Sequence, residues 1–103
     1  MLKWQENYYV GEGIKNPEAI RRKIDQGKMA PGIYLLTLSP NPDNLMEILP
    51  AITLIQDAAY RLCPDIIGMA RGKDEAIQLA ADVLMEAYRR TGTFRVEEYL
   101  KNR

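Results

Sequence analysis

Histidine is absent from this sequence of 103 residues, and cysteine occurs once, at Cys63. Histidine is the commonest general base and transition-metal ligand, so its absence excludes a Ser-His-Asp or Cys-His catalytic arrangement within the chain. A single cysteine excludes an intramolecular disulfide and a metal site built from cysteines. Because no histidine can activate Cys63, a buried structural role is favoured over a reactive thiol. The sequence predicts no cofactor and no catalytic residue.

Long apolar runs and an excess of charge of one sign are also missing. No apolar run approaches the ~20 residues that a membrane-spanning helix needs, and the N-terminus turns polar immediately after Leu2, so we expect a cytosolic protein without a signal peptide. The formal net charge is zero, which argues against a general affinity for nucleic acid or anionic membranes. An apolar fraction of 47% at this length predicts a single folded domain over residues 1–103.

Two strand-loop-helix units occupy most of the chain between Gly32 and Gly92. The strands are predicted at Ile33–Leu38 and Ile66–Ala70, and both are apolar at nearly every position, as central strands covered on both faces are. The repeated order predicts an α/β fold with a small, largely parallel sheet of two to four strands flanked by helices, in the order (β)αβαβα. In such a sheet the loops after both strands lie at the same edge, where ligand sites are common.

The remaining elements are predicted from capping residues and apolar periodicity. Asn16 and Pro17 begin a helix that ends near Gly27, and Asp74 is the expected N-cap of a helix that ends at Gly92. A short strand is expected at Tyr8–Val10 and a final helical turn at Val96–Lys101. In the helix before Gly92, one face is predicted to be buried, comprising Ala76, Ile77, Ala80, Ala81, Leu84, Ala87 and Tyr88.

The segment from Leu45 to Leu62 carries apolar residues at helical spacing, and the stripe keeps its phase across Pro50. Proline in a helix interior removes a hydrogen bond, at a cost of ~3 kcal/mol. We therefore expect one helix kinked at Pro50, with a break into two helices as the alternative.

The strand at Ile66–Ala70 continues into Arg71, Gly72 and Lys73, a loop that could hold an anion at the start of the next helix. It is not a P-loop, because three residues rather than four separate Gly68 from Gly72, and Asp74 stands in place of the Ser/Thr. An ordinary strand-to-helix turn is the favoured interpretation, with a site for a non-nucleotide anion as the alternative.

The loop after the first strand is polar and contains two prolines. Ser39, Asn41, Asp43 and Asn44 could orient a ligand beside the Arg71–Lys73 loop, although turn and capping chemistry also explains these residue types.

Two further motifs carry little signal. Gly11-Glu12-Gly13 lacks the third glycine of a dinucleotide-binding loop, and the basic run Arg21-Arg22-Lys23 is typical of a solvated helix face rather than a nucleic-acid surface.

The segments Ser39–Leu45 and Ile66–Ala76 together resemble small uncharacterised α/β proteins of anaerobic Gram-positive bacteria. The resemblance extends over most of the chain from about Tyr8. It implies an α/β fold, and because that group has no assigned activity it assigns no functional residue.

The leading functional hypothesis is a non-enzymatic cytosolic module that binds a partner protein or assembles with itself, as a homodimer, through an exposed edge of its sheet. The alternative is a protein, possibly an enzyme, that binds a small anionic ligand with Ser39, Asn41, Asp43, Asn44, Arg71, Gly72 and Lys73.

Overall fold

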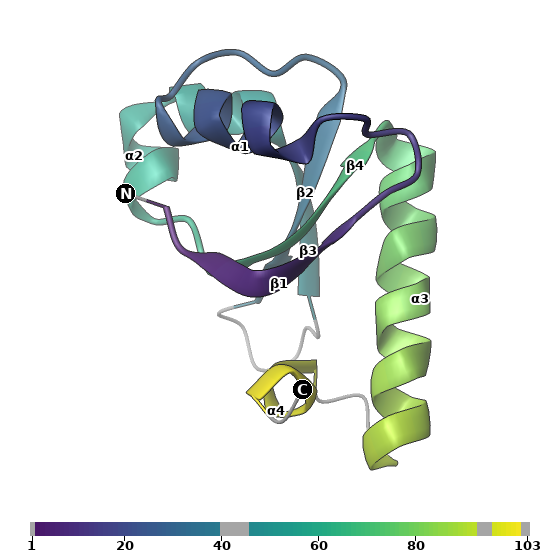
Figure 1. The fold of residues 1–103 in the computed structure, drawn as a ribbon. Coiled ribbons are helices and arrows are strands. Elements are labelled where there is room, and N and C mark those ends of the chain that lie inside the picture. The colour runs from purple at the N-terminus through teal and green to yellow at the C-terminus, as the bar shows by residue number, and fades with distance from the viewer. Residues whose placement is uncertain (1, 40–45, 93–95, 102–103) are drawn as a thin grey trace.

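The computed structural model describes residues 2–39, 46–92 and 96–101 (Figure 1). The strands of these ranges form one sheet in the order β1-β4-β2-β3. Their bounds are β1 (Trp4–Val10), β2 (Ile33–Leu38), β3 (Met46–Pro50) and β4 (Ile66–Arg71). The helices are α1 (Pro17–Asp25), α2 (Asp57–Arg61), α3 (Lys73–Thr91) and α4 (Val96–Lys101), with a 3-10 helix η1 (Ala51–Ile55) before α2.

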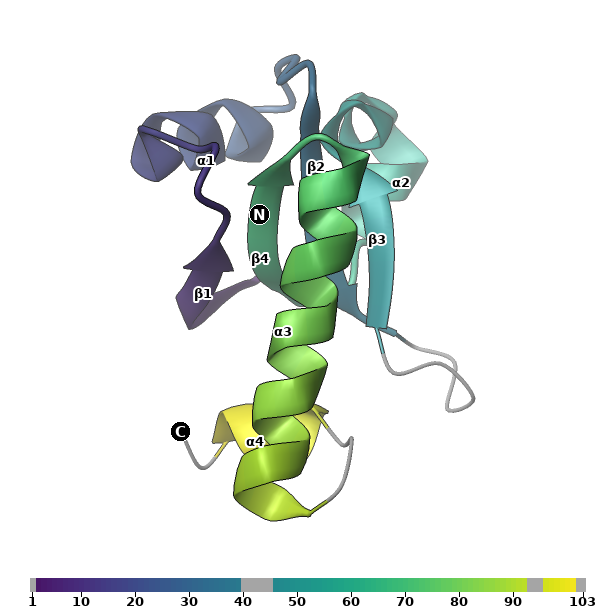
Figure 2. The ribbon, with the colours of Figure 1, turned by 90° about the vertical axis from the view of Figure 1, so that its right-hand side faces the viewer.

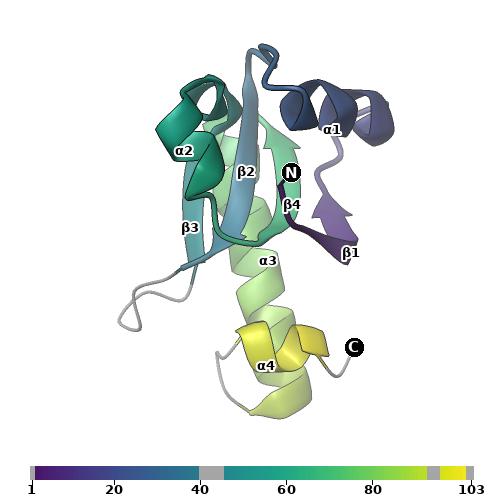
Figure 3. The same cartoon turned by 90° about the vertical axis from the view of Figure 1, so that its left-hand side faces the viewer.

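The sheet separates two layers of helices. α1 and α2 lie on one face of it and α3 on the other, while α4 lies beyond the end of the sheet beside the last turns of α3 (Figures 2 and 3). Each face has its own apolar cluster: Leu35 and Ile24 belong to the α1 side, and Leu36 and Val83 to the α3 side. The prediction that β2 and β4 are covered on both faces is thus confirmed.

The sheet is mixed, so the prediction of a largely parallel sheet is wrong. β1 and β4 are parallel, whereas β2 is antiparallel to both β4 and β3. The chain order is also different, because two strands rather than a strand and a helix follow α1. The N-terminal strand is the parallel neighbour of β4, and it is longer than the expected Tyr8–Val10.

The segment after β2 is the largest difference from the expected helix. Met46–Pro50 forms an edge strand paired with β2, and helix appears only in two short pieces after Pro50. Proline disfavours the helical conformation of the residue before it, and it is tolerated at the end of an edge strand. The strand also places Ile48 and Leu49 against opposite apolar clusters, which one helical stripe would not do. Neither the kinked helix nor the pair of helices is therefore correct.

The capping predictions are confirmed for α1, since the Asn16 side chain accepts a hydrogen bond from the Ala19 amide and Pro17 is the first helical residue. Gly92 ends α3 in a left-handed conformation. The expected N-cap Asp74 is wrong, because Gly72 occupies that position with a φ of +87°. The helical turn at Val96–Lys101 is confirmed as α4.

The buried face of α3 is rotated from the expected one. Ala76, Ala80 and Ala87 are buried with Val83 against the sheet, but Ile77, Ala81 and Tyr88 are exposed. The apolar arc of the helix is wider than the surface that the sheet covers.

Candidate anion-binding pocket

The parallel strands β1 and β4 end side by side, and the helices that follow them lie on opposite faces of the sheet. The chain after β1 passes over Gly11–Asn16 into α1, whereas β4 leads directly into α3 (Figure 1). The Gly11 amide donates to the Met69 carbonyl at 2.9 Å, which holds the two strand ends together. Ligands of α/β proteins commonly bind at such a place, where helices diverge from the carboxyl ends of adjacent parallel strands.

Glu75, in the first turn of α3, fixes the loop after β1 to the end of β4. Its two carboxylate oxygens accept hydrogen bonds from the backbone amides of Gly13 and Arg71. A β-carbon at Gly11 would lie 2.7 Å from Glu75 Cδ, and one at Gly13 would lie 3.0 Å from Glu75 Oε1. The two glycines of the Gly11–Gly13 segment are therefore needed for close approach of this carboxylate, not for binding a dinucleotide.

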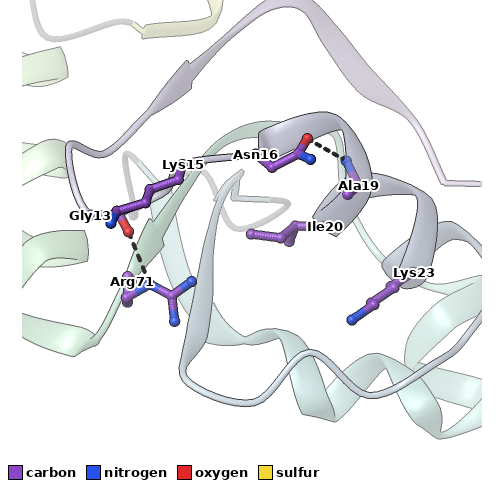
Figure 4. Close-up of a pocket in the computed structure, with 7 residues that line it drawn as sticks. All are labelled: Gly13, Lys15, Asn16, Ala19, Ile20, Lys23 and Arg71. Carbon is purple, nitrogen blue, oxygen red and sulfur yellow. Dashed lines mark hydrogen bonds between the residues drawn. The ribbon is translucent and has the colours of Figure 1, made fainter.

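Arg71 is oriented by the same loop. Its Nε donates to the Gly13 carbonyl at 2.9 Å, so the guanidinium is held at one end while its terminal nitrogens point toward the space below α1 (Figure 4). The side chain is exposed to solvent. This arrangement presents two parallel donors, the geometry that suits a carboxylate or phosphate.

A pocket of about 550 Å³ lies between this guanidinium and α1. Its lining comprises Gly13, Lys15, Asn16, Ala19, Ile20, Lys23 and Arg71 (Figure 4). Three of these side chains are cationic and, within the described part of the chain, none of the lining residues is acidic. Ala19 and Ile20 supply an apolar wall, and the beginning of α1 adds the partial positive charge of a helix N-terminus.

The structure places the predicted ligand residues apart. The backbone amide of Leu38, at the end of β2, donates to the backbone carbonyl of Asp65 just before β4, so the loop after β2 lies at the opposite end of the sheet from Arg71. Ser39 donates from Oγ to Glu47 Oε1 at 3.1 Å, across the β2–β3 pair. Asn41, Asp43 and Asn44 lie outside the described residues. The expectation of one shared edge is wrong because it required β2 and β4 to be parallel.

Of the predicted loop after β4, only Arg71 lines the pocket. The Gly72 amide donates to the Gly32 carbonyl at 2.7 Å, and Lys73 is an exposed residue at the start of α3. The sequence interpretation missed Lys15, Asn16, Lys23 and Glu75. The signal for them was the glycine pair at the end of a strand followed by a capped helix, which becomes informative only when β1 is known to adjoin β4.

The basic run on α1 has divided roles. Arg21 lies over the rings of Trp4 and Tyr8, at 5.0 and 5.5 Å from their centroids, and contacts Asp25 at 3.8 Å. Arg22 and Lys23 are both exposed, and of these two Lys23 lines the pocket (Figure 4). Arg21 is thus a structural residue that holds α1 on β1.

Cys63 is half-buried after α2, and burial together with the neighbouring Asp65 carboxylate raises the pKa of its thiol. Protonation lowers the nucleophilicity of the sulfur at neutral pH, which agrees with a structural cysteine.

Over residues 2–39, 46–92 and 96–101, no cluster of three or more potential metal-ligating side chains was found. In the same ranges, no helix has the length and hydropathy needed to cross a membrane. Comparisons with protein-family models, curated proteins and solved structures found no match. The resemblance to small proteins of anaerobic Gram-positive bacteria therefore stays a prediction, and the pocket itself has to carry the functional argument.

Proposed function

We propose that this protein binds a small organic anion, bearing a phosphate or carboxylate group, in the pocket between α1 and the ends of β1 and β4. The observation that carries the proposal is that three cationic residues, Lys15, Lys23 and Arg71, line one pocket whose described lining has no acid. Three cations raise the local potential, and an anion placed among them gains from all three.

The rest of the lining indicates what else the ligand contains. Ile20 and Ala19 form an apolar wall that suits a ring or aliphatic portion, while the side-chain NH2 group of Asn16, whose Oδ1 caps α1, offers a polar contact. The volume of about 550 Å³ lies within the range of small-molecule sites. A molecule with one anionic end and one apolar end fits both parts of this lining.

The test is isothermal titration with phenyl phosphate, benzoate, inorganic phosphate and uncharged benzyl alcohol, on wild-type protein and on two double variants. Lys23→Gln/Arg71→Gln removes two pocket cations. Arg22→Gln/Lys28→Gln removes two exposed cations outside the pocket lining, with the same change in net charge.

We expect phenyl phosphate to bind more tightly than inorganic phosphate or benzyl alcohol. The pocket variant should lose affinity by roughly 10–100-fold, since it removes two exposed cations and each ion pair at an exposed site contributes up to about 1 kcal/mol. The control variant should retain wild-type affinity. Equal losses of affinity in both variants would show that binding depends on the net charge of the protein and not on the pocket. The absence of binding by any of the anions would refute the proposal.

A further inference from the structure

The outer face of α3 presents an apolar stripe to solvent. Ile77, Met85 and Tyr88 are 49%, 53% and 48% exposed, and Ala81 lies exposed between them. At 100° per residue, these positions fall on one side of the helix, next to the face that packs on the sheet. Figure 2 looks directly onto this helix, which forms the front of the molecule along its whole length. The stripe is thus accessible to another macromolecule.

The charges beside the stripe are self-complementary. Asp74 near the start of α3 and Arg89 near its end are both exposed, and around the helix axis both lie on the same side of Ala81, by about 20° and about 80°. They are seven and eight residues from Ala81, on opposite sides of it along the helix. If a second copy of α3 packs antiparallel about a two-fold axis at Ala81, each Asp74 meets the partner's Arg89. The same register brings Ile77 of each copy opposite the partner's Met85.

Ala81 also suits the crossing point of such a pair. Its small side chain allows two helix backbones to approach closely, and the larger Ile77 and Met85 then pack on either side of it. The apolar surface and the charges therefore select the same register independently.

The sheet edges are less suited to self-association. β3 is only five residues long and ends on Pro50, while the register of β1 against β4 shifts between Trp4 and Tyr9. Short, proline-ended and irregular edge strands are features that protect sheets from pairing with other chains.

We infer that this protein forms a symmetric homodimer through the outer face of α3, with two copies packed antiparallel about Ala81. One pair of helices buries less than the ~800 Å² per partner of a standard stable interface, so the dimer is weak, with a dissociation constant of roughly 1–100 μM. This inference is independent of ligand binding.

The first test is sedimentation equilibrium over a range of protein concentrations on wild type, Asp74→Arg, Arg89→Asp and the double variant that carries both changes. Each single variant places like charges opposite each other at both symmetry-related positions, and should weaken dimerisation by about tenfold. The double variant restores opposite charges and should recover most of the wild-type affinity. Circular dichroism of each variant checks that α3 remains folded.

A dimer in which the two α3 helices are parallel, or one that forms through another surface, predicts no recovery of dimerisation in the double variant. That result would overturn the inference, as would a wild-type protein that stays monomeric at millimolar concentration.

The second test is oxidative cross-linking in a Cys63→Ser background. Ala81→Cys puts a thiol at the two-fold axis, whereas Asp82→Cys puts one at the same height but about 100° around the helix. We expect rapid disulfide-linked dimers from Ala81→Cys and slow formation from Asp82→Cys. Equal rates for the two variants would contradict the proposed helix face.

Discussion

At the scale of single residues, the Glu75 carboxylate is the connection on which the candidate pocket depends. It joins two backbone amides from segments about sixty residues apart, Gly13 and Arg71, and it occupies the space that a side chain at Gly11 would need. The pocket is thus supported by a residue that does not line it.

This geometry predicts coupling between Gly11 and Glu75. Gly11→Ala should destabilise the protein by about 1–3 kcal/mol, because the new methyl group meets the carboxylate carbon at 2.7 Å. In a Glu75→Ala background the obstruction is gone, so the same change should cost much less. Urea unfolding of wild type, both single variants and the double variant measures the coupling free energy. Additive losses would show that Glu75 does not occupy this space in solution.

At the scale of secondary-structure elements, sequence patterns located β2, β4, α1 and α3 closely, because each has strong boundary signals such as Asn16-Pro17 and Gly92. β3 was misassigned since its apolar residues are compatible with helical spacing and the segment is only five residues long. What decides its conformation is pairing with β2, a tertiary interaction that periodicity does not contain. The incorrect prediction of the buried face of α3 has a similar cause. Periodicity shows which residues are apolar, but it does not show which of them another element covers.

The end of α3 gives a prediction at this scale. Gly92 has a φ of +77°, which glycine adopts without strain and most other residues do not. Gly92→Ala should therefore lower the free energy of unfolding by about 1 kcal/mol. Gly92→Asn is the matched comparison, because asparagine tolerates the left-handed region, and its loss should be smaller. Thermal or urea denaturation of the two variants ranks them, and an alanine variant as stable as wild type would contradict the left-handed conformation at residue 92.

At the scale of the whole molecule, the candidate pocket was located from the order of the strands in the sheet and not from sequence motifs. The principle that ligands bind beyond the carboxyl ends of parallel strands directed the prediction to the loops after β2 and β4, but the parallel partner of β4 is β1 and not β2. Composition cannot reveal this, since the two paired strands are separated by α1, a β-hairpin and α2. Arg71 was identified because it directly follows a recognisable strand, whereas Lys15 and Lys23 become pocket residues only through that pairing.

The central position of β4 predicts that the fold cannot form without it. β4 pairs with both β1 and β2, so a chain ending at residue 65 keeps three strands and loses the strand that joins them. We expect this fragment to lack a cooperative thermal transition and to show far-UV circular dichroism of an unfolded chain. A fragment with a sharp transition would show that the β2–β3 hairpin and the α1–α2 layer are stable without β4.

The packing around Trp4 also gives the protein an optical reporter of its own. Trp4 is the only tryptophan in the chain, its indole nitrogen donates to Asp25 at 2.7 Å, and Arg21 lies over its ring. Both of these partners belong to α1, the helix that also carries Lys23 into the pocket. If ligand binding shifts α1, the polarity around this single fluorophore changes with it, and intrinsic emission then follows pocket occupancy as well as unfolding without a label.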